Sequence, residues 1–421
     1  MSTHDPHPAS AEPALPLTGI RVVEFTHMVM GPTCGMMLAD LGAEVIKIEP
    51  VQGDNTRRLK GSGAGFFTMF NRNKKSLPVN LQDPRGIELV LKLIATADIV
   101  SENFKAGTMA RLGLDYATLS KLNERLIYVS HKGFLPGPYQ HRTALDEVVQ
   151  MMGGLAYMTG PEGRPLRAGA AVNDIMGGMF GAMGAMAALL ERQRTGRGQE
   201  VQSALFENNV FLVGHHMMQY AVTGKPAAPM PSRISAWAVY DVFTVKDGEQ
   251  IFLAVVSDTQ WKLFCDAFGF ADLAADARLA GNNDRVEARA WLMPILRERL
   301  ASEPAAAIAA RFEAHGLPYA PIAKPQDLFD DPHLAATGGL AEIALPQDGA
   351  GSGAGSGAGS GAVNAHAKVP LLPITLGGRR PGVRIDPPAL GAHGAQLLET
   401  LGLSATQIAA LTEAGVVGPV N

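Results

Sequence analysis

Short apolar runs alternate with amphipathic stretches along the first half of the chain. Five runs have the length and the Val, Ile and Leu content of buried strands: Arg21–Phe25, Glu44–Glu49, Lys75–Leu81, Asp98–Glu102 and Leu126–Ser130. Apolar residues at helical spacing separate them, as in Pro84–Ala97, which begins with the proline that a first helical turn tolerates. Strands that alternate with helices commonly form a parallel sheet, so this half predicts a doubly wound α/β domain.

The pattern changes after residue 223, where a Pro- and Ala-rich stretch predicts a linker. Beyond it, Ala238–Thr244 and Gln250–Val256 flank a Lys-Asp-Gly turn, which is typical of an antiparallel hairpin. Helical spacing follows over Thr259–Phe268, Arg285–Ala301 and Ala305–His315, so we expect a smaller α+β domain. The predicted organisation is a disordered segment 1–16, a large domain 17–223, a linker 224–236, a small domain 237–335, and a return to the large domain over 336–421 with a flexible Gly-Ala-Ser loop at 349–362.

Composition narrows the classes of molecule that we expect this protein to bind. Of the 421 residues 47% are hydrophobic and 18% are charged, which provides a sizeable core, and the net charge of −4 gives no electrostatic basis for binding nucleic acid. No apolar stretch is long enough for a membrane span, and residues 1–16 lack the pattern of a signal peptide. Cys34 and Cys265 lie outside any metal-ligand spacing. We therefore expect a cytoplasmic protein with two free thiols and no metal.

Asp174 stands out because a long segment without charge, 175–190, follows it. Met179–Leu190 predicts a helix, which places Asp174 at or near its N-terminus, where backbone N–H groups and the helix dipole would keep the carboxylate ionised and aimed. An ionised, positioned carboxylate is what a nucleophilic aspartate requires. Aspartates before helices also serve as simple caps, and the local sequence leaves both interpretations open.

Other polar residues follow predicted strands or form short clusters. His27 comes just after the first strand, where open α/β sheets bind ligands, but the Gly pattern of a nicotinamide site is absent around it. Asn103 and Phe104 follow a later strand and suit a nucleotide base or pantetheine. The run Asn71–Ser76 is basic and polar, which fits either a phosphate-binding loop or a solvated loop.

Taken in order, several segments resemble the family III CoA-transferases, the CaiB/BaiF family that includes formyl-CoA transferase. The matching segments are Leu17–Phe25, Gly31–Pro32, Leu41–Glu49, Asn71–Ser76, Asp98–Phe104, Arg111–Gly113, Asp174, Arg194–Gln199, Asp258–Trp261 and Gly316–Pro321. The resemblance extends from about Leu17 to the C-terminus, interrupted by the Gly-Ala-Ser loop. Many spaced matches in one order are more specific than any single match.

This resemblance implies a Rossmann-like large domain built from both chain ends, a small domain between them, and a homodimer of two interlocked subunits. It also implies that Asp174 is the nucleophile of a CoA transfer that passes through a mixed anhydride and an aspartyl-CoA thioester. Coenzyme A and its acyl esters would be substrates, with no tightly bound cofactor. By resemblance, the residues near CoA are His27, Met28, Asn103, Phe104 and Arg111.

Departures from the family's sequence patterns narrow the range of reactions that we expect. Pro50 stands where formyl-CoA transferase has an arginine, and Ser232–Val242 replaces its glycine run, which argues against oxalate or formyl-CoA as substrate. Leu145 stands where the related α-methylacyl-CoA racemases have a histidine, and an apolar side chain cannot return a proton, so transfer is favoured over racemisation. A non-catalytic CoA-ester-binding partner protein is the third alternative. The expected reaction takes CoA from succinyl-CoA to a small dicarboxylate, and the arginines available to bind the second carboxylate are Arg142, Arg167 and Arg233.

Overall fold

The computed structural model describes residues 14–233, 235–346 and 365–420. The first 13 residues of the segment predicted to be disordered, and the whole predicted Gly-Ala-Ser loop at 349–362, lie outside the described residues. The chain forms two compact units. One unit combines the chain up to Pro226 with the chain from Pro332 onward, and the other consists of Ala227–Asp331.

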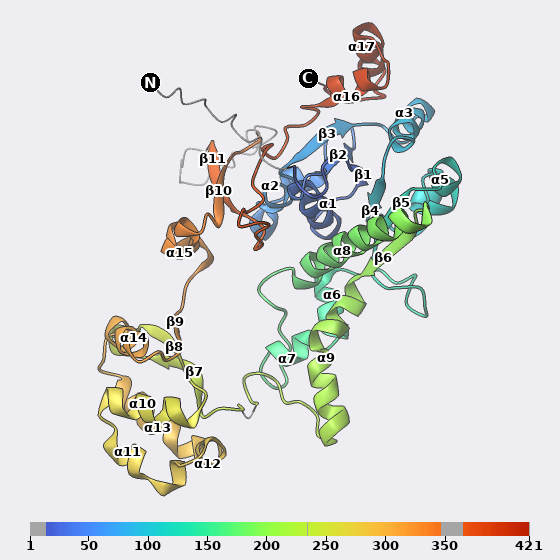
Figure 1. Ribbon diagram of the computed structural model, residues 1–421. Coiled ribbons are helices and arrows are strands. Elements are labelled where there is room, and N and C mark those ends of the chain that lie inside the picture. The colour runs from blue at the N-terminus through green and yellow to red at the C-terminus, as the bar shows by residue number, and fades with distance from the viewer. Residues whose placement is uncertain (1–13, 234, 347–364, 421) are drawn as a thin grey trace, which may run out of the picture. The chain divides into compact units, whose positions relative to one another are not determined.

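The larger unit contains a six-stranded sheet in which every pairing is parallel (Figure 1). In spatial order the strands are β3 (Lys74–Pro78), β2 (Glu44–Glu49), β1 (Arg21–Phe25), β4 (Ile99–Glu102), β5 (Ile127–Lys132) and β6 (Glu200–Ala204). The predicted parallel sheet is thus confirmed. Strand β6 was not predicted, because its sequence is short and half polar, and β3 begins and ends earlier than the predicted Lys75–Leu81.

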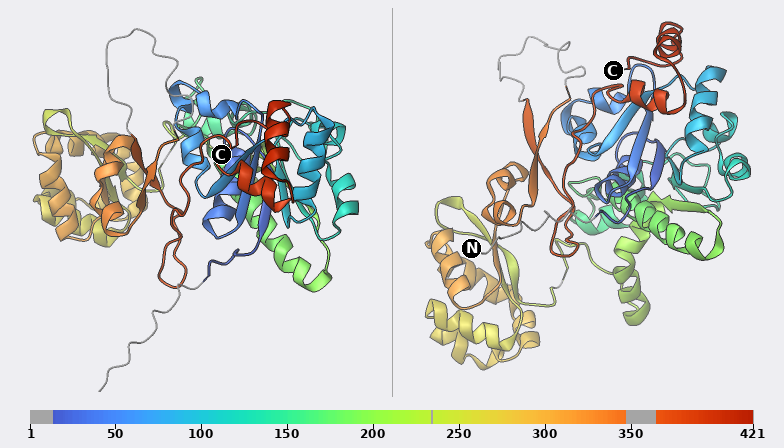
Figure 2. Two further views of the ribbon diagram at one scale, coloured as in Figure 1. Left: turned by 90° about the horizontal axis from the view of Figure 1, so that it is seen from above. Right: turned by 45° about the horizontal axis from the view of Figure 1, so that its top comes forward.

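Helices cover both faces of the sheet. On one face, α1 (Met30–Asp40) and α8 (Val172–Thr195) bury an apolar layer against the strands. On the other face, α3 (Pro84–Ile94) and α5 (Tyr116–Leu122) share a core with the C-terminal helices α16 (Gly394–Thr400) and α17 (Ala405–Glu413). Figure 2 shows these C-terminal helices beside the first strands of the chain. The order of the strands reverses between β1 and β4, and in open α/β sheets such a switch point opens a crevice at the carboxyl ends of the strands.

Helix α8 is longer than the predicted Met179–Leu190, and Asp174 lies inside its first turn. The sequence suggested a later start because several glycines, which are poor helix formers, lie in the first turns. These glycines allow a close approach to neighbouring elements. A Cβ atom at Gly178 would stand 2.5 Å from the Met30 carbonyl oxygen, and one at Gly181 would stand 2.5 Å from the ring of His131. Tertiary packing therefore outweighs local propensity here.

The basic run Asn71–Ser76 is neither a solvated loop nor a phosphate-binding loop. Its charged side chains at Arg72 and Lys74 are buried and paired inside the protein. Arg72 forms an ion pair with Asp40 at 2.7 Å, and Lys74 forms one with Glu24 at the same distance. Each charge therefore has a partner that offsets the cost of removing it from water, and both interpretations from the sequence were wrong.

The smaller unit contains the predicted hairpin. Strands β7 (Val239–Thr244) and β8 (Gln250–Val255) pair in antiparallel fashion, and β9 (Tyr319–Pro321) adds a third strand. Helices α10 (Asp258–Phe268), α13 (Arg289–Leu300) and α14 (Ala305–Ala314) bury Phe264, Leu292 and Phe312 against it. The remaining elements of this unit are η3 (Lys246–Gly248), α11 (Ala271–Ala275), η4 (Ala277–Leu279), α12 (Asn282–Glu287) and η5 (Pro325–Asp330).

The remaining elements of the larger unit are one long helix and several short segments. They are η1 (Asn55–Arg58), η2 (Gly61–Gly63), α2 (Phe66–Phe70), α4 (Thr108–Arg111), α6 (Asp146–Met152), α7 (Leu155–Thr159), α9 (Leu205–Thr223), α15 (Pro332–Ala336), and the antiparallel pair β10 (Leu340–Ala344) and β11 (His366–Pro370). Of these, η1, α4 and α6 follow or approach the carboxyl ends of the parallel strands. Asp146, the first residue of α6, lines the crevice itself.

Candidate active site

A cleft of about 400 Å³ opens at the switch point between β1 and β4. It is lined from three strand ends, from the loop that leads to α6, and from the first turn of α8. The polar residues that line it are His27, Asn103, Lys105, His131, Lys132, Gln140, His141, Arg142, Thr143, Asp146 and Asp174. The structure therefore brings Asp174 together with four of the five residues expected near CoA, namely His27, Met28, Asn103 and Phe104.

Asp174 does not cap its helix. The capping position of α8 is Ala171, and no side chain caps it locally. Instead Asp146, the first residue of α6, accepts hydrogen bonds on one carboxylate oxygen from the backbone N–H groups of Asn173 at 2.8 Å and Asp174 at 3.2 Å. Among the described residues, the Asp174 carboxylate itself accepts no hydrogen bond. Capping therefore does not explain why an aspartate stands at position 174.

The Asp174 carboxyl group is held partly protonated near neutral pH. Burial and the negative charge of Asp146 raise the pKa of Asp174 to about 7. The sequence predicted the opposite, a carboxylate kept ionised by helix N–H groups. That expectation was wrong because the carboxyl group is buried, and because Asp146 occupies these N–H groups and adds a like charge nearby.

The loop after β1 carries His27 and Met28 into the cleft. The Asn103 side chain holds this loop from the neighbouring strand end: its Oδ1 accepts from the His27 N–H at 3.0 Å, and its Nδ2 donates to the His27 carbonyl at 2.8 Å. The His27 ring lies 5.9 Å from the Phe104 ring. Burial lowers the pKa of His27, so the imidazole is predominantly neutral at pH 7.

Arg111 lies outside the cleft lining. It belongs to α4, is exposed, and donates to the Thr108 hydroxyl at 3.0 Å. A second cleft of about 490 Å³ lies at the ends of β2 and β3, with Pro50, Gln52 and Asn80 in its wall. Phe104 lines both clefts, so the two are neighbours.

Several cleft residues were missed from the sequence. His131 and Lys132 end strand β5, and Lys105 follows β4 by three residues, so position after a strand was a usable signal. Lys132 pairs with Glu102 at 2.7 Å. Asp146 had no such signal, because its contact with α8 joins residues 28 positions apart in the sequence.

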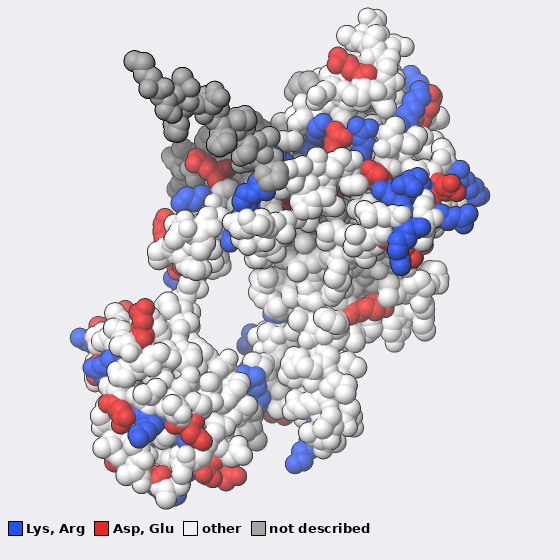
Figure 3. Space-filling view, in the orientation of Figure 1, with Lys and Arg blue, Asp and Glu red and all other residues white. Residues whose placement is uncertain are grey.

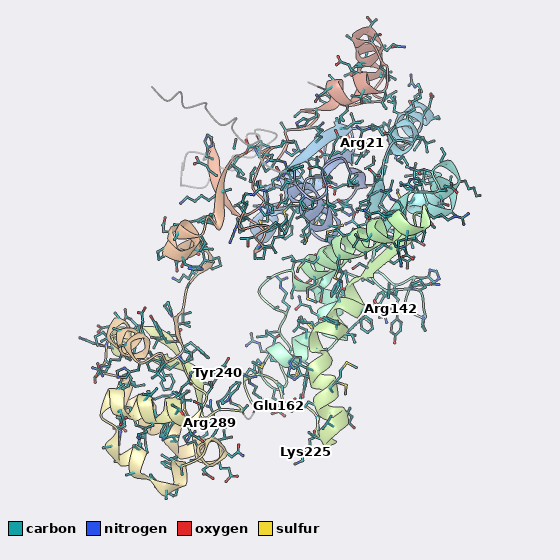
Figure 4. All side chains as sticks on the ribbon, in the orientation of Figure 1. Arg21, Arg142, Glu162, Lys225, Tyr240 and Arg289 are labelled. Carbon is teal, nitrogen blue, oxygen red and sulfur yellow. The ribbon has the colours of Figure 1, made fainter. Side chains whose placement is uncertain are left out.

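The three arginines considered for a second carboxylate lie in different surroundings. Arg142 lines the Asp174 cleft, on the loop between β5 and α6, where Figure 4 labels it. Its guanidinium lies 5.0 Å from the centre of the Tyr139 ring. Arg167 forms an ion pair with Glu147 at 2.8 Å, and Arg233 belongs to the smaller unit. Of the three, Arg142 is the one that shares a cleft with Asp174.

Cys34 and Cys265 are free and buried, and burial raises the pKa of each thiol to about 12. Neither is therefore a nucleophile at neutral pH. No group of three His, Cys, Asp or Glu side chains within the described ranges is arranged to hold a metal ion. In the same part of the chain, no helix combines the length and apolar character needed to cross a membrane.

The fold and the cleft agree with the relationships of the sequence. The chain belongs to CoA-transferase family III, whose profile matches residues 17–394, and it is an enzyme of this class. It is 36% identical over 336 residues to succinate–glutarate CoA-transferase of Agrobacterium fabrum, covering 77% of this chain and 84% of that protein. It is also 36% identical over 333 residues to acetyl-CoA:oxalate CoA-transferase of Acetobacter aceti, with 77% and 85% covered.

Solved structures support the same relationship. A CaiB/BaiF family protein from Brucella suis matches with a TM-score of 0.79 and 33% sequence identity, and the match covers 92% of this chain and all of that one. The resemblance found in the sequence is therefore confirmed at the level of the family and of the mixed α/β fold.

Proposed function

We propose that Asp174 is the nucleophile that carries the acyl group and then CoA during the transfer. The Asp174 carboxylate attacks the donor thioester, which forms a mixed anhydride and releases CoA thiolate. The thiolate attacks the aspartyl carbonyl, which releases the donor acid and leaves an aspartyl-CoA thioester. The acceptor carboxylate attacks this thioester and displaces CoA thiolate, and attack of the thiolate on the acceptor acyl carbon then frees the new acyl-CoA and Asp174.

The observation that carries this proposal is the environment of the Asp174 carboxylate. The carboxylate lines the cleft at the strand ends, in the same lining as Lys105 and Arg142 from two loops and Lys132 from the end of β5, and it accepts no hydrogen bond within the described residues. Its pKa of about 7 leaves a large carboxylate fraction at neutral pH while making the oxygen more basic than an ordinary aspartate. Both properties suit a nucleophile.

We place CoA along the carboxyl ends of the strands, across the two clefts that Phe104 lines. The pantetheine thiol end would then reach Asp174 past His27, Met28 and Asn103, while the nucleotide end would lie beyond Phe104. Arg111 lies outside both linings, so a role in binding CoA would require its exposed side chain to turn toward the ligand.

The acceptor is a small dicarboxylate, with succinyl-CoA as the donor. Arg142 supports this choice because its guanidinium lines the Asp174 cleft and has no acidic partner among the described residues. The two relatives described above carry glutarate and oxalate in their names, and both acids are dicarboxylates. Oxalate therefore belongs in an acceptor panel, although Pro50 and Ser232–Val242 depart from the formyl-CoA transferase pattern. Exclusive turnover of monocarboxylates would refute this assignment.

Racemisation of an α-methylacyl-CoA is the second candidate. Leu145 argues against it, because 64% of this apolar side chain is exposed and it lines the cleft where the second proton carrier of a racemase would act. The two activities are distinguished by incubating the protein with 2-methylacyl-CoA in deuterium oxide. Incorporation of deuterium at the α-carbon would show racemase chemistry.

Trapping of the covalent intermediate tests the nucleophile. The protein is incubated with succinyl-CoA and then hydroxylamine, and peptide mass analysis should find an aspartyl hydroxamate at Asp174. Asp174→Asn is the control and should give neither adduct nor turnover, while Glu147→Gln, at an exposed acid beside the cleft, should give both. A protein that binds CoA esters without any adduct would instead be a non-catalytic binding partner.

We also propose that the protein works as an interlocked homodimer in the cytoplasm, where its two buried thiols stay reduced. Helix α9 supports the dimer because it leaves large apolar side chains in solvent: Phe211 is 72% and Val222 is 79% exposed. Figure 3 shows the surface over α9 almost without charged side chains, and Lys225 follows just after the helix. A second copy of the chain is the occupant that the family resemblance implies. Light scattering should show a dimer, and Phe211→Asp should weaken it.

A further inference from the structure

Met28 has an unusual backbone conformation at the edge of the cleft. Its φ is +63°, in the left-handed region that residues other than glycine, asparagine and aspartate rarely adopt. The side chain is 40% exposed and lines the cleft beside His27. Such a conformation persists only where the surroundings determine it, and it is often found where a ligand is bound.

Three residues from other parts of the fold hold Met28 and the two residues before it. Lys47 Nζ donates to the Thr26 carbonyl at 2.6 Å, and Asn103 holds both backbone groups of His27 as described above. The N–H of Met28 itself donates to the Thr56 hydroxyl oxygen at 3.0 Å. Three successive residues after β1 are therefore fixed by side chains from other elements.

The Thr56 hydroxyl is in turn fixed by a buried carboxylate. It donates to Asp54 Oδ1 at 2.7 Å, and the Thr56 N–H donates to the same oxygen at 2.8 Å. The other oxygen of Asp54 lies 3.0 Å from Lys47 Nζ. All three side chains are buried, so these bonds act at low dielectric and reinforce one another. Burial alone would raise the pKa of Asp54, but Lys47 and Thr56 outweigh burial and lower it, so the carboxylate is ionised at neutral pH.

We propose that Thr56, oriented by Asp54 and Lys47, is a positioning residue that presents the His27–Met28 loop to the CoA ester. Thr56 and Asp54 do not line the Asp174 cleft themselves, so they act through Met28. Because the Thr56 proton points to Asp54, its lone pair is left for the Met28 N–H, which fixes the left-handed turn before any ligand binds. This inference rests on the proposed binding of CoA in the cleft.

The test measures binding of CoA by calorimetry together with KM and kcat. Thr56→Val keeps the shape of the side chain but removes the hydroxyl, and with it the bonds to the Met28 N–H and to Asp54. It should raise the Kd of CoA and KM about tenfold with a smaller change in kcat, the scale expected when the buried Met28 N–H loses its hydrogen bond. Thr56→Ser should bind nearly like the wild type. Thr337→Val, which removes a hydroxyl just after α15 and outside the linings of both clefts, is the control and should leave both constants unchanged.

A double-mutant cycle separates positioning from a general structural role. Glycine adopts the left-handed conformation freely, so Thr56→Val should weaken binding much less in a Met28→Gly background than in the wild type. Thr56→Ala replaces the valine variant if that variant does not fold. Equal binding by Thr56→Val and wild type, or equal effects in both backgrounds, would overturn the inference. Failure of the wild type to bind CoA would instead contradict the proposed function.

Discussion

At the scale of single residues, the site depends on two aspartates with different tasks. One oxygen of the Asp146 carboxylate accepts from backbone N–H groups at the N-terminus of α8, whereas the Asp174 carboxylate accepts no hydrogen bond among the described residues. The sequence singled out Asp174 because a charged residue directly before a long uncharged segment requires a structural or functional explanation. It could not assign Asp146, because the contact depends on how α6 and α8 meet.

The first prediction concerns the dependence of activity on pH. A nucleophilic carboxylate must be ionised, so kcat/KM should rise with pH and level off above about 7, the pKa of Asp174. Asp146→Asn removes the like charge while leaving an oxygen to accept the helix N–H groups, so the midpoint of the profile should move to lower pH. Glu147→Gln is the neighbouring control and should not move it. An unchanged midpoint in Asp146→Asn would show that Asp146 does not influence the titration.

The second prediction concerns stability. The pKa of Asp174 is raised in the folded protein, so the folded state binds more protons than the unfolded state between about pH 4 and pH 7. The free energy of unfolding therefore falls as pH rises across this window. Above the window, the ionised form of Asp174 destabilises the folded state. Asp174→Asn resembles the protonated acid and should increase the free energy of unfolding by about 2 kcal/mol at pH 8, with no gain at pH 4. Denaturant titrations at both pH values measure this, and a gain equal at both would contradict it.

At the scale of elements, the patterns that the sequence revealed are those that depend on local periodicity. The apolar runs at Arg21–Phe25 and Glu44–Glu49 are strands at the predicted residues, and the hairpin of the smaller unit is present. The failures at Asn71–Ser76 and at the start of α8 share one cause. Buried ion pairs and close glycine contacts are tertiary interactions, which join residues far apart in the sequence. No local window of sequence therefore contains both partners of such a contact.

The third prediction tests the close packing of α8 on α1. Gly178→Ala would place a methyl group 2.5 Å from the Met30 carbonyl oxygen and from the Thr33 side chain. The carbonyl oxygen belongs to the backbone of α1 and cannot move aside easily. The free energy of unfolding should fall by about 1–3 kcal/mol despite the better helix propensity of alanine. Gly214→Ala in α9 meets nothing within 4 Å and is the matched control, which should be neutral or slightly stabilising. Equal effects on thermal unfolding would argue against the contact.

At the scale of the whole molecule, the larger unit is assembled from both ends of the chain. Hydrogen bonds join the C-terminal segment to the residue before β3. Asn73 Oδ1 accepts from the N–H groups of Arg384 and Ile385, at 2.6 and 2.9 Å. Periodicity alone could not show that residues more than 300 positions apart share a core. The pattern along the chain predicted a return to the large domain over 336–421, and the family resemblance implied a large domain built from both chain ends.

The fourth prediction follows from the shared core. Removal of residues 394–421 would uncover the apolar layer that α16 and α17 form with α3 and α5. The truncated chain should bind a hydrophobic dye and aggregate, whereas removal of residues 1–13 alone should have little effect on solubility. Dye fluorescence and sedimentation measure both variants, and a soluble truncated chain with normal activity would contradict the prediction.

The position of α16 and α17 also sets the order of events during synthesis on the ribosome. One face of the parallel sheet can be covered once α8 and β6 have left the exit tunnel, but the opposite face waits for α16 and α17. The whole smaller unit emerges while that face is still open. The larger unit therefore cannot bury this apolar layer until α16 and α17 have been synthesised, and the layer stays exposed to water in the meantime.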